Sequence, residues 1–234
     1  MMLYIFLLIF ITYIGYYLKM TRTKKTKSDK PVSERLRMDI LSGEYRAGEW
    51  LKQADIEEKY NANRFEVRIA LSDLSARKII DHISNRGYRV INPTDREREE
   101  LYEVRTVLET AAAKMAVQRA TESDIAELSL IVEEFYHAIE NQGRENLINY
   151  NVKFHEKFYA LSQNKLLARQ IIEMRERGLP GRSGGWDTVA GIRASNDDHA
   201  EMVEMLKKKD PDGMAYIIYR HLNRWREFTS PAEK

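Results

Sequence analysis

The chain has 234 residues, of which 43% are hydrophobic and 32% charged, so its length and composition fit one large domain or two smaller ones with a real core. It contains no cysteine, which excludes disulfide bonds and thiolate metal sites. The net charge of +2 hides an asymmetry: residues 20–94 carry 16 basic and 11 acidic side chains, residues 95–234 carry 21 and 25, and a polyanion is therefore expected to bind the first part.

The chain begins with an uncharged apolar run, MMLYIFLLIFITYIGYYL, which a basic arm follows at residues 20–30. Segment 1–19 is barely long enough to span a bilayer, and the basic flank would then keep the rest in the cytoplasm, anchored at the inner membrane. It lacks the features of a cleaved secretory signal. The alternative is that Met20 is the natural start and that no membrane is involved. Both interpretations place the remaining chain in the cytoplasm.

Residues 31–92 are predicted to form a winged helix-turn-helix domain. Apolar spacing predicts helices in PVSERLRMDILSG, QADIEEKYN and RFEVRIALSDLSARK, with a short apolar piece, GEWLK, after the first. KIIDHI and GYRVIN then read as two strands of a hairpin that turns at Gly87. This order of elements is typical of a winged helix-turn-helix.

The start of the third helix and the hairpin tip are the predicted DNA contacts. The first turns of a recognition helix reach base edges and phosphates in the major groove. The donor fork of arginine matches the two acceptors of guanine, so Arg64 and Arg68 are the candidates for reading the sequence. The alternative is that these arginines form an ordinary solvated surface. The predicted DNA-binding residues are Asn63, Arg64, Phe65, Arg68, Arg86 and Gly87.

From residue 95 onward the pattern predicts an all-α antiparallel helical bundle, so the expected fold class is mainly α. Its domain is expected to span residues 95–230, with helices at about 95–120, 122–141, 143–162, 164–177, 189–208 and 210–228. Residues 92–94 are the expected hinge, because Pro93 keeps Asn92 extended and Thr94 can cap the next helix.

Three of the five histidines fall on the apolar sides of three different predicted helices, whereas His137 points outward and His82 lies in the wing. One buried histidine usually has a structural partner, but three unpaired imidazoles in an apolar bundle would be costly. A divalent metal, Zn²⁺ or Ni²⁺, would satisfy them together with an oxygen one helical turn before the first histidine. The predicted metal ligands are Asn151, His155, His199 and His221.

A metal at this site could serve any of three functions. A metal-dependent hydrolase fused to a DNA-binding module would need a carboxylate base beside the ion, and Glu156 lies about 100° off the ligand face. A regulator that senses the metal itself is another interpretation. A metal that holds a small anionic ligand fits better. Arg105 is the candidate for binding a ligand carboxylate, and an ion pair within the bundle is its alternative role.

At this point the chain resembles the GntR family of transcriptional regulators, in the FadR-like subfamily with a C-terminal, all-helical FCD domain. Three stretches carry the resemblance: LSGEYRAGEWL, the recognition helix ANRFEVRIALSDL, and the set Asn151-x-x-x-His155, His199 and His221. The last is similar to the family's Asp-x-x-x-His, His and His metal set. Positions that depart from the family pattern are Asn63 for Ser, Phe65-Glu66 for Thr-Pro, Ile69 for Glu, Ala54 for a basic residue and Asn151 for Asp.

The resemblance implies a transcriptional repressor or activator that is not an enzyme. It implies a homodimer on a palindromic double-stranded operator, controlled by a small carboxylate effector bound beside a divalent metal. The departures in the recognition helix imply an altered operator. Because a neutral amide oxygen is a poorer ligand than a carboxylate, Asn151 implies weaker metal binding or a different metal.

Overall fold

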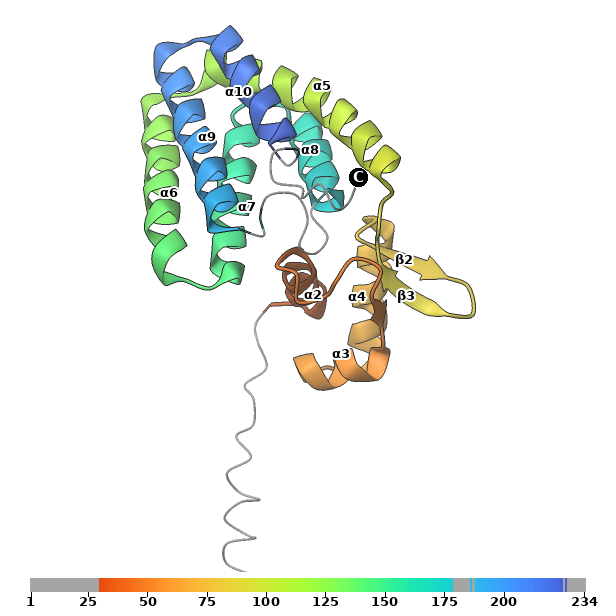
Figure 1. Cartoon of the computed structure of the whole chain (residues 1–234). Helices are drawn as coiled ribbons and strands as arrows, with labels where there is room; N and C mark the ends of the chain where they lie inside the picture. Colours follow the sequence, from red (N-terminus) through yellow and green to blue (C-terminus); the bar gives the residue numbers. More distant parts are fainter. Residues whose placement is uncertain (1–29, 179–185, 187, 225, 227–234) are drawn as a thin grey trace, which may run out of the picture.

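The computed structural model describes residues 30–178, 186, 188–224 and 226, which form an N-terminal winged part below a C-terminal helical bundle (Figure 1). The expected apolar segment 1–19 lies outside these residues. Within them, no helix combines the length and hydropathy that crossing a membrane requires. The fold class is mainly α, as predicted.

The N-terminal part contains three helices and a small sheet within the described residues. They are α2 (Val32–Leu41), β1 (Trp50–Leu51), α3 (Gln53–Tyr60), α4 (Arg64–Ala76), β2 (Ile80–Ile83) and β3 (Gly87–Val90). The inner face of α4 buries Val67, Leu71 and Leu74 completely, as their spacing predicts. Asn61 ends α3 in the left-handed conformation, with φ of 49°, and so turns the chain into α4.

The wing is a three-stranded antiparallel sheet of order β1-β3-β2, rather than the predicted two-stranded hairpin alone. The register pairs Ile80 with Val90 and Ile83 with Gly87, and Trp50 of β1 lies opposite Arg89. At the tip, Asn85 and Gly87 have φ of 60° and 96°, which suits these two residue types. A two-residue strand is too short to show an alternating pattern in a sequence.

The bundle consists of α5 (Asp95–Arg119), α6 (Glu122–Asn141), α7 (Arg144–Ala160), α8 (Lys165–Arg177), α9 (Val189–Lys208) and α10 (Pro211–Asn223). Side-chain caps fix where several of these helices begin. Thr94 and Glu97 form a reciprocal capping box at the start of α5, which confirms the predicted cap at the hinge. The apolar faces meet in one core that contains Phe154, Phe158 and Met202.

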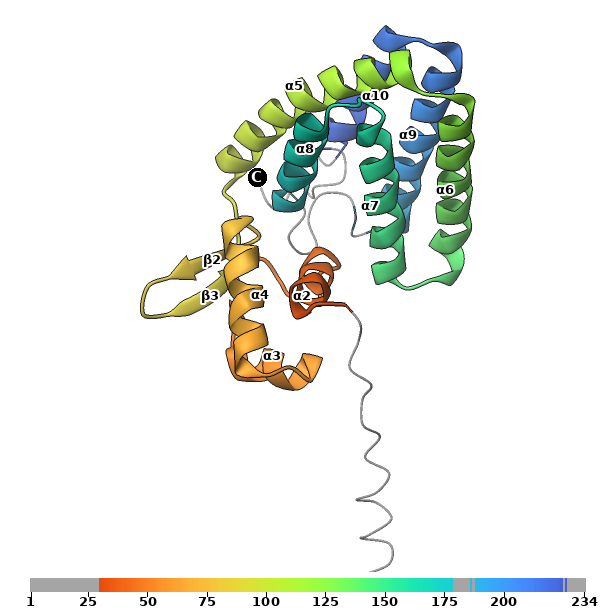
Figure 2. The same ribbon diagram turned by 180° about the vertical axis from the view of Figure 1, so that it is seen from behind.

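Helix α2 lies between α4 and the lower end of the bundle in both opposite views (Figures 1 and 2). Its Leu36 and Ile40 belong to the core of the N-terminal part. Its Met38 and Leu41 pack instead in a cluster with bundle residues that include Phe135. One helix therefore contributes to two cores and fixes the winged part against the bundle.

Candidate metal centre and nucleic-acid interface

Three imidazoles from α7, α9 and α10 converge inside the bundle. Nε2 of His155 lies 3.1 Å from Nε2 of His199, and the ring centroids of both lie 5.2 Å from that of His221. One ligand nitrogen from each ring can be chosen so that all lie within 4.8 Å of one another. The three histidines that the sequence singled out thus come together, although they are far apart in the chain.

The surroundings keep these imidazoles neutral. Burial lowers the pKa of His155 and His199 well below the usual value, and the positive charge of Arg175 lowers both further. Burial also lowers the pKa of His221, while its bond to Asp198 opposes that shift. Neutral rings keep a nitrogen lone pair, which is the form that binds a metal ion.

The distances suit one shared cation. Two nitrogens that bind the same ion at 2.0–2.1 Å lie about 2.9–3.4 Å apart in tetrahedral or octahedral geometry, and the separation between Nε2 of His155 and Nε2 of His199 falls in this range. Asn151 is buried one turn before His155, and its Oδ1 has no hydrogen-bond partner among the described residues. A buried oxygen without a partner is costly, so this donor set fits a metal ion.

Asp198 holds the third histidine in place. Its buried carboxylate accepts a bond of 3.2 Å from Nδ1 of His221, which leaves the other ring nitrogen for the shared site. Arg220 and Arg224 also donate to Asp198, at 3.0 and 2.7 Å from their Nε atoms. Burial opposes ionisation, but the bonds from His221 and the arginines lower the pKa of Asp198. The carboxylate is therefore charged and orients the imidazole ring of His221.

A second polar layer adjoins the histidines. Glu109 is fully buried on α5 and accepts bonds from Nε of Arg105 at 2.7 Å and Nη1 of Arg175 at 2.9 Å. The hydroxyl of Tyr159, one turn after His155 on α7, donates to the same carboxylate. Two guanidinium groups share one carboxylate, so this layer has an excess positive charge that favours an anionic ligand.

Arg105 is the residue predicted to bind the effector, with an ion pair inside the bundle as the alternative. The structure contains that ion pair, with Glu109. The guanidinium of Arg105 also lies over the ring of Tyr102, at 4.6 Å from the centroid. Another unsatisfied group lies on α9, one turn before His199: the buried hydroxyl of Ser195 has no hydrogen-bond partner within the described part of the chain. Helices α7 and α9 run in the same direction (Figure 1), so Ser195 and Asn151 lie on the same side of the histidine cluster.

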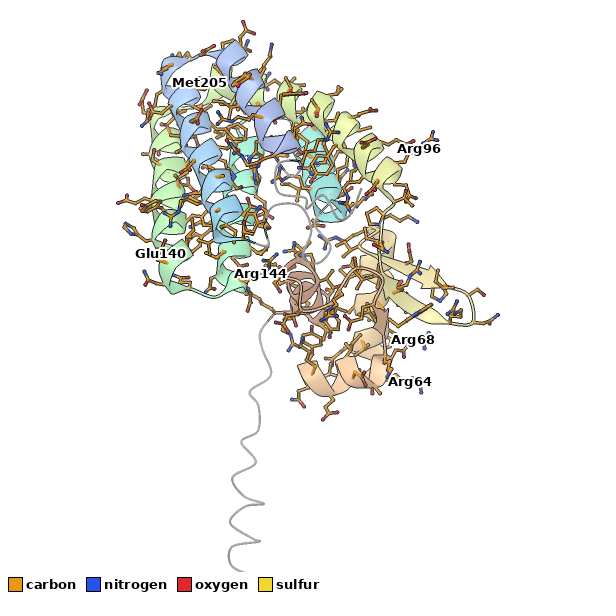
Figure 3. The ribbon with its side chains drawn as sticks, in the orientation of Figure 1. Arg64, Arg68, Arg96, Glu140, Arg144 and Met205 are labelled. Carbon is orange, nitrogen blue, oxygen red and sulfur yellow. The ribbon has the colours of Figure 1, made fainter. Side chains whose placement is uncertain are left out.

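The predicted DNA-contacting residues occupy one outer region of the N-terminal part. Figure 3 shows Arg64 and Arg68 one above the other on α4, on the side towards which the β2–β3 hairpin projects. Asn63 caps α4, with its side chain accepting from the backbone of Glu66. At the wing tip the Arg86 guanidinium lies 4.7 Å from the centre of the Trp50 ring, and Gly87 makes the turn.

Glu156, the nearest sequence neighbour that could act as a base, does not face the histidines. It is exposed and lines a groove of about 390 Å³ between α7 and α8. The sequence did not reveal the roles of Glu109, Tyr159, Arg175 and Asp198. Their positions could have indicated two of these residues. Arg175 and Asp198 are charged, yet they lie on the same buried helix faces as Ile171 and Met202.

Comparisons with known proteins agree with this architecture. Residues 100–224 match the FCD domain, and residues 29–90 match the bacterial regulatory proteins of the gntR family. The chain is 30% identical over 200 residues to the gluconate operon transcriptional repressor of Bacillus licheniformis, which covers 80% of this chain and 79% of that protein. It is 26% identical over 186 residues to the Nta operon transcriptional regulator of Aminobacter aminovorans, with 79% and 86% covered.

A solved structure has the same fold. The Escherichia coli protein McbR/YncC aligns with a TM-score of 0.72 at 22% identity, over 85% of this chain and 97% of that one. At this identity the likeness shows the arrangement of helices and wing, and no shared ligand follows from it.

Proposed function

Because the chain belongs to the GntR family of bacterial regulators and carries a C-terminal FCD domain, we propose that it binds a palindromic operator as a homodimer and responds to a small carboxylate held beside a divalent metal. The family makes it a DNA-binding transcriptional regulator and not an enzyme. The observation that carries the sensing half of the proposal is the convergence of three neutral imidazoles around one point inside the bundle.

The DNA-binding surface would consist of Asn63, Arg64, Phe65, Arg68, Arg86 and Gly87. Arg64 and Arg68 are exposed on the first turns of α4, where a recognition helix meets base edges. Arg86 is held over Trp50 at the wing tip, where it can bind the neighbouring backbone or minor groove.

A twofold dimer would match the palindrome, since each copy reads one half-site. Helix α5 supports this part of the proposal. Its Val104 and Val107 lie on one face and are 46% and 69% exposed, which provides an apolar surface for a second copy.

The metal would be Zn²⁺ or Ni²⁺, held by His155, His199 and His221 together with the amide oxygen of Asn151. The bound ion would supply a positive charge that attracts an anionic ligand. The chain's own contribution is to keep the three rings neutral and to orient His221 through Asp198.

The effector carboxylate would meet the positive layer around Glu109. Arg105 and Arg175 each have donors beyond the single bond that each makes to Glu109. The unsatisfied hydroxyl of Ser195 is a further donor on the histidine side. We therefore expect the effector to be a small molecule that carries a carboxylate.

The signal would reach the DNA-binding part through α8. Arg175 binds Glu109 in the sensing layer, and the next residue, Glu176, binds Arg37 and Arg77 of the N-terminal part at 2.8 and 2.6 Å. A ligand that competes with Glu109 for Arg175 would shift α8. Such a shift would also move Glu176, which binds Arg37 and Arg77. Coupling of this kind requires different contacts in two states.

The test uses the purified full chain, fluorescence anisotropy on an operator obtained by selection from random DNA, and a panel of small carboxylic acids. Metal-loaded protein should change its operator affinity with one class of acids, and metal-stripped protein should not. Response to the metal with no acid present would favour a metal sensor instead. Absence of stoichiometric metal after incubation with Zn²⁺ or Ni²⁺ would contradict the sensing half.

A further inference from the structure

The outer face of α4 carries two large apolar side chains that the protein itself does not bury. Phe65 is 71% exposed and Ile69, one turn further, is 54% exposed. Among the described residues 30–94, Phe65 and Ile69 are the only large apolar side chains that are exposed. The inner face of α4, by contrast, buries Val67 and Leu71 completely. Exposing such side chains forgoes the free energy of burial, so a partner that covers them is expected.

The position of the pair indicates which partner this is. Phe65 and Ile69 alternate along α4 with the exposed Arg64 and Arg68, which Figure 3 shows on the side of the wing. The whole face therefore combines apolar and cationic groups at the end of a recognition helix. DNA has a polyanionic backbone, whereas an apolar protein surface would leave the arginines without charge partners.

Glu66, the acidic residue of this helical turn, belongs to the helix cap. Glu66 turns back, and its carboxylate accepts from the backbone N–H of Asn63 at 2.9 Å in the capping box. The cap also fixes the first turn of the helix, so that the side chain of Phe65 projects from a rigid backbone.

The major groove presents one apolar feature on its base edges, the C5 methyl group of thymine. Aromatic and aliphatic side chains contact this group, while arginine binds the acceptors of guanine. We propose that Phe65 and Ile69 are specificity-determining residues that contact thymine methyl groups, next to the guanines bound by Arg64 and Arg68. Each operator half-site then combines guanine with thymine. This inference rests on the proposed role of α4 as the reading helix.

The experiment removes only the methyl groups. An operator is selected with the full chain from random duplex DNA, and each thymine of one half-site is replaced in turn by deoxyuridine, which keeps the hydrogen-bonding edge. Affinity is measured by anisotropy in the presence of competitor DNA. At two positions the change should weaken binding about three- to five-fold, the loss expected for one buried methyl group. Thymines outside the half-sites serve as control positions.

Protein variants then assign each methyl group to its side chain. At one of the two sensitive positions, Phe65→Ala should bind the operators with thymine and with deoxyuridine equally well. At the other position, Ile69→Ala should bind both operators equally well. Leu130→Ala, a 54% exposed apolar residue on α6, is the matched control and should keep the full discrimination. Circular dichroism checks that the variants fold.

The outcomes separate this inference from the proposed function. If no specific operator is recovered, both fail. If a specific operator is bound equally well with thymine and deoxyuridine, or if Phe65→Ala and Ile69→Ala keep the wild-type preference, the regulator stands and the methyl contacts are refuted.

Discussion

Arg175 and Glu176 are neighbours on α8, yet their side chains bind different parts of the molecule. Nη1 of Arg175 lies 2.9 Å from Oε2 of Glu109 inside the bundle. The carboxylate of Glu176 accepts from Nη1 of Arg37 at 2.8 Å and from Nη2 of Arg77 at 2.6 Å, both in the N-terminal part. One turn of one helix thus joins the polar layer around Glu109 to the N-terminal part.

Glu176→Gln should uncouple the two parts. The amide keeps the shape but loses the charge that pairs with the buried Arg37, so the free energy of unfolding should fall by about 1–3 kcal/mol in urea titrations. Metal binding should stay unchanged, while the change of operator affinity on adding the effector should shrink. Glu173→Gln on the same helix is the control, because its carboxylate contacts Arg169 and Gln170 of the same helix. An intact effector response in Glu176→Gln would rule out this route.

Asn151→Asp should have opposite effects on the metal-free and metal-bound protein. A carboxylate is a stronger ligand than an amide, so affinity for Zn²⁺ should rise by an order of magnitude or so in calorimetry. Without metal, the variant places a charged carboxylate in the buried position of a neutral amide. Burying this charge is costly, so the melting temperature should fall. Asn146→Asp, an exposed change on the same helix, should alter neither quantity. Equal metal affinity in Asn151→Asp and wild type would remove this residue from the ligand set.

Asp198→Asn should weaken metal binding without removing a ligand. It deprives His221 of its charged acceptor, and the loss of such a partner typically costs about 10- to 100-fold in metal affinity. The variant also leaves Arg220 and Arg224 without this carboxylate, so stability should decrease as well. Asp197→Asn changes the exposed neighbour and is the matched control. Unchanged metal affinity in the Asp198 variant would contradict the orienting role.

His199→Ala should abolish stoichiometric metal binding, measured by elemental analysis after dialysis against Zn²⁺. The imidazole of His199 is fully buried and its Nε2 is 3.1 Å from that of His155, so the substitution removes one of the three imidazoles at the centre of the proposed site. The rise in melting temperature on adding metal should disappear with it. His137→Ala removes an exposed histidine of α6 and should retain one ion per chain.

Arg68→Ala should abolish specific operator binding and leave the helical content and the oligomeric state unchanged. The side chain of Arg68 is exposed, so its removal should not disturb the fold. Losing a bidentate contact to guanine costs about 1–3 kcal/mol at each half-site. Arg96→Ala on α5 removes another exposed arginine, far from the recognition helix, and should bind like wild type (Figure 3). A band shift with the wild-type midpoint for Arg68→Ala would refute the assignment.

The sequence predicted most of the fold because its signals are local. Capping residues such as Thr94 and Thr121 fix where several bundle helices begin, and apolar residues at helical spacing fix which face each helix buries. Strand β1 could not be predicted, because two residues are too few to show the alternation of apolar and polar side chains that marks a strand. The apolar spacing of α2 predicts a helix, but its division between two cores depends on tertiary packing.

The candidate site was predicted in part. Histidines at apolar positions are conspicuous in a sequence, and the convergence of His155, His199 and His221 followed from their inner faces. The layer around Glu109 was not foreseen. Charged side chains are usually solvated, and only the fold shows that Arg105 and Arg175 approach one carboxylate from two helices.

The double packing of α2 has a consequence for how the protein responds to heat and to proteases. Leu36 and Ile40 on one side and Met38 and Leu41 on the other belong to different cores, so melting either core exposes part of the other. Calorimetry should therefore record a single cooperative transition in place of two. Cutting the backbone at residues 92–94 should yield fragments that remain associated through a size-exclusion column.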